Sequence, residues 1–146
     1  MKDGLPQFLA LDWNGTVVPW FGEPAFPRAM AFIQHLAESG VRICIVSHAT
    51  QSQIEGDVER LPIVADEVIG CSDKGRAFLQ LQDRWGCGLA IGDTAMDLRA
   101  ALEAGIPFVQ ARLEGQSLLP QCHGAIEDWG EAEAILQGMA SIYSAY

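Results

Sequence analysis

The chain has 146 residues, the length of one domain, with 49% hydrophobic and 19% charged residues. This composition excludes a disordered chain and favours a soluble domain with a buried core. Nine Lys and Arg residues against 19 Asp and Glu residues give a net charge of −10, which disfavours nucleic acid as a partner.

The apolar runs of the sequence predict neither a membrane span nor a signal peptide. No apolar run approaches the roughly 18 residues of a membrane span, and the first run, 8–11, ends at Asp12. We therefore expect a cytoplasmic protein without a membrane partner. The four cysteines form no C-x-x-C pair, so their spacing favours neither a zinc site nor a disulfide framework.

Short apolar runs alternate with segments of helical periodicity along the whole chain. The runs predict strands at 8–11, 42–46, 67–69, 88–91, 108–111 and 124–126. The periodic segments predict helices at about 27–40, 52–61, 73–85, 94–104 and 132–142. A capping box of Ser52 and Glu55 is expected to start the second helix, and Leu102 is expected to face the core.

This alternation predicts an α/β fold with one doubly wound, Rossmann-like parallel sheet and helices on both faces. Residues 1–146 are expected to form a single domain. The segment 17–25 fits neither element type, and because it follows the first strand we expect a flap over the carboxyl edge of the sheet.

Polar residues end three of the predicted strands. Asp12, Ser47 and Asp93 each follow an apolar run, and the carboxyl ends of parallel strands meet at one edge, where ligands bind. Two carboxylates placed together repel each other unless a cation lies between them, and hard oxygen ligands suit Mg²⁺. The alternative for each residue alone is an ordinary strand end or helix cap.

The motifs resemble those of the haloacid dehalogenase-like (HAD) superfamily of phosphohydrolases. FLALDWNGT at 8–16 is similar to the first motif of that family, and GDTAMD at 92–97 is similar to the fourth. Ser47 and Lys74 resemble the second and third motifs in the same order. The resemblance covers essentially the whole chain and implies a Mg²⁺-dependent phosphatase acting on a phosphorylated substrate.

The resemblance also implies a role for each matching residue. Asp12 would be the nucleophile that forms an aspartyl phosphate, and Lys74 would pair with Asp12 and the phosphate. Mg²⁺ would be held by Asp12, the main-chain carbonyl of Asn14 and Asp93, with Asp97 supporting the metal through water.

Two neighbouring side chains complete the expected site. The resemblance implies that Ser47 donates a hydrogen bond to the transferring phosphoryl group. His48 follows it at the edge of the site, either as a substrate contact or as an exposed loop histidine.

The chain departs from the family pattern at Asn14, where active phosphatases of this family carry a second Asp that acts as acid and base. An amide cannot do this work, and general acid–base catalysis contributes about 10²- to 10⁴-fold. Three alternatives follow: substrates whose leaving groups need no proton, a slow phosphatase, or a degenerate domain that binds a phosphorylated ligand or a protein partner.

The second departure is the lack of sequence for a cap domain. Only 25 residues, 17–41, separate the first motif from the second strand, and 26 separate Ser47 from Lys74. An open site is expected to admit a phosphorylated small molecule or a larger phosphorylated substrate. A neighbouring subunit in a homo-oligomer would be another way to cover it.

Overall fold

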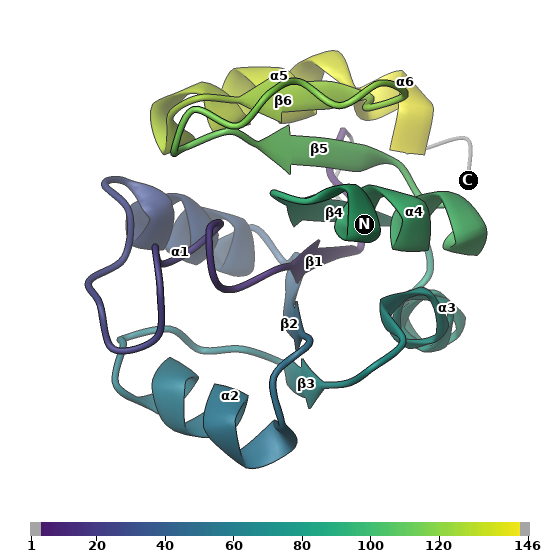
Figure 1. Ribbon diagram of the computed structural model, residues 1–146. Coiled ribbons are helices and arrows are strands. Elements are labelled where there is room, and N and C mark those ends of the chain that lie inside the picture. Colours follow the sequence, from purple (N-terminus) through teal and green to yellow (C-terminus); the bar gives the residue numbers. More distant parts are fainter. Residues whose placement is uncertain (1–3, 144–146) are drawn as a thin grey trace.

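A single six-stranded parallel sheet forms the centre of the molecule. The computed structural model describes residues 4–143, and Figure 1 shows the strands in the order β3-β2-β1-β4-β5-β6. Every neighbouring pair is parallel, as the sequence predicts. The strands are β1 (Phe8–Leu11), β2 (Arg42–Ser47), β3 (Glu67–Gly70), β4 (Gly88–Gly92), β5 (Phe108–Ala111) and β6 (Gly124–Ile126).

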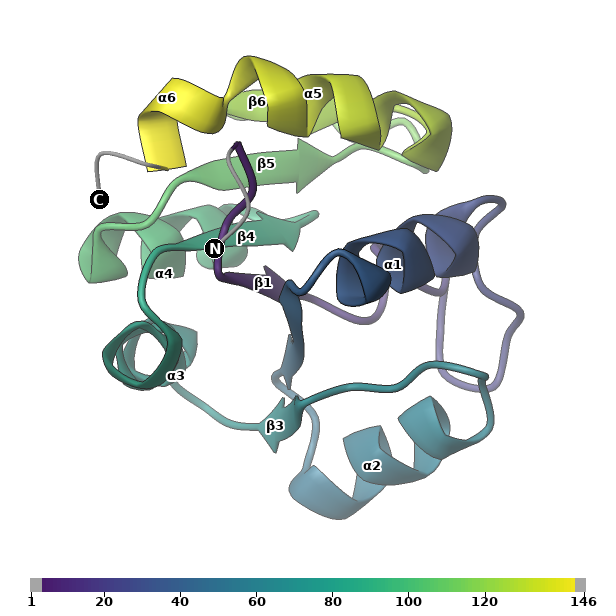
Figure 2. The same cartoon turned by 180° about the vertical axis from the view of Figure 1, so that it is seen from behind.

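Helices cover both faces of the sheet, which confirms the doubly wound architecture. They are α1 (Ala29–Glu38), α2 (Gln51–Glu59), α3 (Lys74–Trp85), α4 (Ala95–Ala104), α5 (Ala132–Gly138) and α6 (Ala140–Tyr143), with a 3₁₀ turn η1 at Trp129–Glu131. Figures 1 and 2 show α1 and α2 on one face and α3 and α4 on the other. Within residues 4–143, no helix has the length and apolar character needed to cross a membrane.

The two faces of the sheet bury separate apolar layers. In β1, Leu9 and Leu11 pack with α1 and α2, whereas Phe8 and Ala10 pack with α3 and α4. Successive side chains of a strand point to opposite faces, so a strand buried on both sides reads as a continuous apolar run. The strands could be predicted from the sequence because they form such apolar runs.

Some helix details differ from the sequence-based expectation. The N-cap of α2 is Thr50, whose hydroxyl accepts a hydrogen bond from the Gln53 amide at 3.3 Å, so Ser52 lies inside the helix. Leu102 is 45% exposed, because α4 turns Ala100, Ala101 and Ala104 toward the sheet instead.

The chain changes direction between β1 and β4. From β1 it runs outward through β2 and β3, then crosses back to β4 on the other side of β1. The Asp12 amide donates to the Ile91 carbonyl at 2.9 Å, so the carboxyl ends of both strands lie together. Such a switch point opens a crevice between the two diverging connections, where open α/β sheets bind ligands.

The first part of the loop after β1 is tightly folded, and the flap follows it along the chain. The Trp13 carbonyl accepts the amides of Thr16 and Val17, at 3.1 and 2.9 Å, and the Trp129 indole donates to the Thr16 carbonyl at 3.0 Å. Val17 and Val18 are fully buried. The expected flap at 17–25 is therefore shorter, and its exposed part begins at Trp20.

Candidate active site

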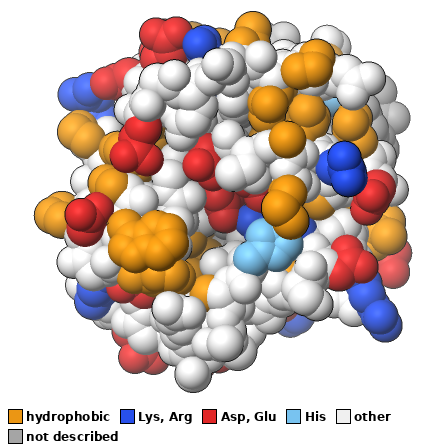
Figure 3. Space-filling model, in the orientation of Figure 1, with side chains coloured by type: hydrophobic (Ala, Val, Ile, Leu, Met, Phe, Trp, Pro, Cys, Tyr) orange, Lys and Arg blue, Asp and Glu red, His pale blue; other side chains and the backbone are white. Residues whose placement is uncertain are grey.

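The carboxyl ends of the strands open into a cavity of about 510 Å³. Figure 3 views this face and shows acidic side chains in a hollow, with apolar groups and a histidine at its margin. The lining includes all the site residues that were predicted from the sequence: Asp12, Asn14, Ser47, His48, Lys74, Asp93 and Asp97. The structure thus brings together residues that are spread from position 12 to position 97 of the chain.

Lys74 lies at the centre of the cluster and is only 3% exposed. It is the first residue of α3, which Asp73 caps by accepting the Arg76 amide at 3.1 Å. Its Nζ donates to Asp12 Oδ1 at 2.7 Å and to Asp97 Oδ1 at 2.6 Å. Burial alone would lower the pKa of Lys74, but the two carboxylates raise it above its ordinary value, so the ammonium stays charged.

Asp12 follows β1 and faces the cavity. Burial raises the pKa of its carboxyl to about 6, against the opposing effect of the Lys74 ammonium. The nearby Asp93 adds to the rise in the pKa of Asp12, first by a hydrogen bond between the two carboxyl groups and then by the repulsion of like charges. At neutral pH the carboxylate is nevertheless mostly ionised, which is the state a nucleophile needs.

Asp97 connects the Lys74 ion pair to the start of α4. Its Oδ2 accepts from the amide and the hydroxyl of Thr94, at 3.2 and 3.0 Å, and its own amide donates to that hydroxyl. Burial, followed by the negative charge of Asp12, raises the pKa of Asp97. Both carboxylate oxygens have protein partners, so Asp97 fits an outer role through water better than direct metal contact.

Two buried oxygen atoms at the site lack hydrogen-bond partners among the described residues. They are Asn14 Oδ1 and Asp93 Oδ1. Buried polar atoms are nearly always satisfied, so unpaired oxygens beside carboxylates fit a cation. Oxygen atoms of Asp12, Asp93 and Asp97 also lie within 4.8 Å of one another. This hard, anionic donor set suits a divalent ion such as Mg²⁺.

Gly15 makes room for the Asp93 carboxylate. A Cβ at this position would lie 2.2 Å from Asp93 Oδ2, and the backbone has a φ of +80°, which L side chains rarely adopt. The loop after β1 and the end of β4 therefore meet in a contact that only glycine permits.

Ser47 and His48 lie at the end of β2. Ser47 is buried, and its oxygen accepts the Ala49 amide at 3.2 Å. Its hydroxyl donates to no group in the described part of the chain, so it is available to a ligand in the cavity. His48 is exposed at the rim, in agreement with the loop position expected from the sequence.

Asp57 on α2 is a supporting residue that the sequence analysis missed. It accepts the Trp13 indole at 2.6 Å and the Gly22 amide at 2.9 Å, and Arg60 binds it at 2.7 and 3.0 Å. It therefore ties α2 both to the residue after Asp12 and to the flap. The available signal was a charged residue between Ile54 and Val58, on the buried face of α2.

The rim of the cavity also holds residues to which the sequence assigned no role. Trp20 and Met96 are 61% and 64% exposed, although both are large and apolar. Gln53 and Glu114 approach from α2 and from the loop after β5. The sequence places Trp20 in the expected flap and Met96 within the GDTAMD motif, but it indicated no role for either side chain. Gln53 and Glu114 belong to no motif, so the sequence offered no signal for them.

No family model and no curated protein matches the chain. Solved structures do. A HAD-superfamily hydrolase from Ehrlichia chaffeensis has a TM-score of 0.74 at 13% identity, over 95% of this chain and 98% of that one. The 3-deoxy-D-manno-octulosonate 8-phosphate phosphatase from Moraxella catarrhalis, in complex with magnesium and phosphate ions and KDO, gives 0.68 at 17%, over 98% and 93%.

DsGPDH of Dunaliella salina has a TM-score of 0.76 at 18% identity, covering 89% of this chain but 29% of that chain. This chain is therefore similar to a part of that protein. Together these likenesses show that the chain has the fold found in HAD-superfamily phosphatases.

The Asp57 network generates a pH-dependent prediction. The Arg60 hydrogen bonds lower the pKa of Asp57 below its ordinary 3.8, so its stabilisation is complete above that value and is lost as the pH falls through the folded-state pKa. Asp57→Asn is expected to lower the free energy of unfolding by about 2 kcal/mol at pH 7. The deficit should shrink below about pH 4.

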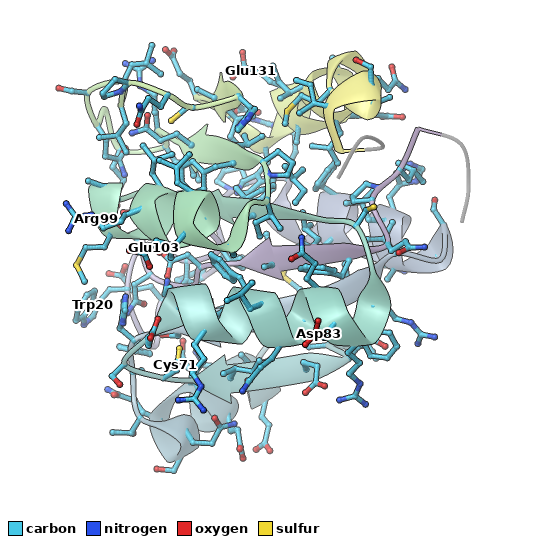
Figure 4. All side chains as sticks on the ribbon, turned by 90° about the vertical axis from the view of Figure 1, so that its right-hand side faces the viewer. Trp20, Cys71, Asp83, Arg99, Glu103 and Glu131 are labelled. Atoms are coloured by element: carbon cyan, nitrogen blue, oxygen red, sulfur yellow. The ribbon has the colours of Figure 1, made fainter. Side chains whose placement is uncertain are left out.

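Urea unfolding at pH 7 and at pH 3 measures both effects. Asp83→Asn is the matched control, because Figure 4 labels Asp83 on the outer side of α3, where it is exposed and makes no ion pair with the described residues. Equal stability of the two variants at pH 7 would show that the network does not hold the flap.

Proposed function

We propose that the protein is a Mg²⁺-dependent phosphohydrolase in which Asp12 is the nucleophile. The observation that carries this proposal is the buried Lys74 ammonium, held between Asp12 and Asp97 at the switch point of the sheet. A buried lysine that links two carboxylates in a cavity fits a site that must place negative charge next to an anionic substrate. The shared fold of HAD-superfamily phosphatases supports the same reading.

The proposed metal ligands are Asp12, the main-chain carbonyl of Asn14 and Asp93, with Asp97 in support. The unpaired Asp93 oxygen and the cluster of carboxylates favour this assignment. When bound, Mg²⁺ would neutralise charge on the phosphoryl oxygens. The magnesium and phosphate ions bound to the Moraxella catarrhalis phosphatase support this choice of ion.

In the proposed reaction, a carboxylate oxygen of Asp12 forms a bond to phosphorus as the bond to the leaving oxygen breaks. Ser47 donates its free hydroxyl hydrogen to the phosphoryl group, and Lys74 holds Asp12 and the phosphate in line. Water then attacks the aspartyl phosphate, which releases inorganic phosphate and restores Asp12. We expect His48, at the rim of the cavity, to contact the rest of the substrate.

A second candidate function rests on Asn14. Its amide lies two residues from Asp12 and cannot give or take a proton during the reaction. The same geometry therefore also suits a degenerate domain that binds a phosphorylated ligand or a protein partner. In either case the cavity is open to solvent and admits small or larger phosphorylated molecules.

Asp12→Asn tests the proposed function directly. We expect the native protein to hydrolyse some phosphate monoesters or acyl phosphates in the presence of Mg²⁺. The variant should lose at least about 10³-fold in kcat, because an amide cannot form the aspartyl phosphate. A screen of phosphorylated compounds with and without Mg²⁺ measures this. Asp83→Asn should retain full activity, and the absence of turnover with every compound would favour the binding domain.

Magnesium is expected to raise the melting temperature. An ion that binds the folded state but not the unfolded chain stabilises by mass action, about 2.7 kcal/mol at a hundredfold excess over Kd. The rise should shrink in Asp93→Asn, which removes one proposed ligand, and persist in Asp83→Asn. Thermal melts at several Mg²⁺ concentrations give the answer, and a melting temperature independent of Mg²⁺ would refute the assigned metal site.

Asn14→Asp is expected to restore the missing acid and base. Side-chain volume is nearly unchanged, so only protonation chemistry differs. The kcat/KM for an alkyl phosphate, whose leaving group needs a proton, should rise about 10²-fold or more, and that for acetyl phosphate much less. Both should be measured at saturating Mg²⁺. An equal change for the two substrates would mean that Asn14 does not occupy the position of an acid and base.

A further inference from the structure

The proton-transfer groups of the cavity are almost all committed to other contacts. Lys74 is held by two carboxylates, and both oxygens of Asp97 accept hydrogen bonds. Asp12 is the proposed nucleophile, and Asp93 is a proposed metal ligand. Of the titratable groups within residues 4–143 that line the cavity, only His48 and Glu114 remain. Both are exposed at the margin of the cavity, so a leaving group deep in the site meets no free proton donor among the described residues.

An aromatic platform stands on the flap side of the cavity. Trp20 and Phe21 form an edge-to-face pair with centroids 5.4 Å apart, and Pro19 precedes them. Figure 4 shows the labelled Trp20 at the margin toward which the β1 arrow points, away from the body of the protein. The hydrogen bond from Gly22 to Asp57 fixes the end of this segment. An exposed but anchored indole offers a flat surface for a ring.

The charge around the platform disfavours a second anionic group on the substrate. Lys74 is the only Lys or Arg that lines this cavity among the described residues, and it is already paired. Arg60, at the C-terminal end of α2, is bound to Asp57. Arg99 lines a smaller adjoining cavity together with Glu103, and Figure 4 shows both above Trp20 on the same margin.

We infer that the substrates of the phosphohydrolase proposed above are aryl phosphates, in which the phosphate is carried on the phenolic oxygen of an uncharged ring. Asp12 bonds to phosphorus, the bond from phosphorus to the phenolic oxygen breaks, and the phenolate leaves with the electron pair. Phenols ionise near pH 10, far below alkyl alcohols, so no acid is required. Hydrolysis of the aspartyl phosphate consumes one water, whose protons end on phenol and phosphate.

The test compares three leaving groups in the full-length protein with saturating Mg²⁺. Phenyl phosphate has a ring and a good leaving group, acetyl phosphate has a good leaving group without a ring, and glycerol 3-phosphate has neither. We expect kcat/KM for phenyl phosphate to exceed that for glycerol 3-phosphate by about 10²-fold or more. An aryl phosphate can be a small molecule or a phosphotyrosine side chain of a protein. A phosphotyrosine peptide distinguishes these two sources, because its kcat/KM exceeds that of phenyl phosphate only if the substrate is a protein.

Substitutions of Trp20 distinguish binding of the ring by the platform from the effect of a good leaving group. Trp20→Ala should raise KM for phenyl phosphate about tenfold and leave acetyl phosphate unchanged, whereas Trp20→Phe should retain most of the affinity. Leu79→Ala is the control, because Leu79 is an exposed apolar residue on α3 that does not line the cavity.

The outcomes separate the two proposals. If no compound is hydrolysed, the proposed function is wrong, and the inference that rests on it is wrong as well. If acetyl phosphate is hydrolysed but Trp20→Ala affects phenyl phosphate no more than Leu79→Ala does, the function stands and the inference is overturned. It is also overturned if glycerol 3-phosphate is turned over as fast as phenyl phosphate. Loss of that activity in His48→Gln would then identify His48 as the acid.

Discussion

The interaction on which the site depends is the buried ammonium of Lys74 between the carboxylates of Asp12 and Asp97. A buried charge without partners is strongly unfavourable, and a pair survives burial only when its geometry is good and its remaining hydrogen bonds are made. Three elements provide that geometry: the end of β1 carries Asp12, the first turn of α3 carries Lys74, and the first turn of α4 carries Asp97. The ion pairs thus join the two sides of the switch point. Thr94 caps the start of α4 and, through the same hydrogen bonds, holds the Asp97 carboxylate in the site.

The charge balance of the cavity explains why this ion pair does not complete the site. In the described part of the chain, four carboxylates line it, from Asp12, Asp93, Asp97 and Glu114, against the single ammonium of Lys74. The excess negative charge is concentrated near β1 and β4, where the pKa of Asp12 is raised and an oxygen of Asp93 lacks a partner. Positive charge from outside the chain is the simplest remedy, and an anionic substrate could enter such a site only together with it.

The sequence predicted the sheet and the polar edge well, because both follow from rules that act over short distances. Continuous apolar runs mark strands buried on both faces, and Asp12, Ser47 and Asp93 lie together because parallel strands end on the same side. The Asp57 network could not be predicted in this way. It joins residues 44 and 35 positions apart through an indole and a backbone amide, and no local pattern encodes such a contact. The start of the flap was misplaced because the burial of Val17 and Val18 depends on the tertiary packing of the loop.

The hydrogen bond from the Trp129 indole to the Thr16 carbonyl spans 113 positions of the chain. A protein emerges from the ribosome N-terminus first, and contacts distant in sequence form only when both partners are available. The loop that carries Asp12 is therefore made before η1, yet it is secured only after η1 has been synthesised. A nascent chain halted before that point holds all of β1 to β6 and every residue of the acidic cluster. It lacks the indole that closes the loop, so completion of the site waits for a residue that contributes none of the acidic side chains.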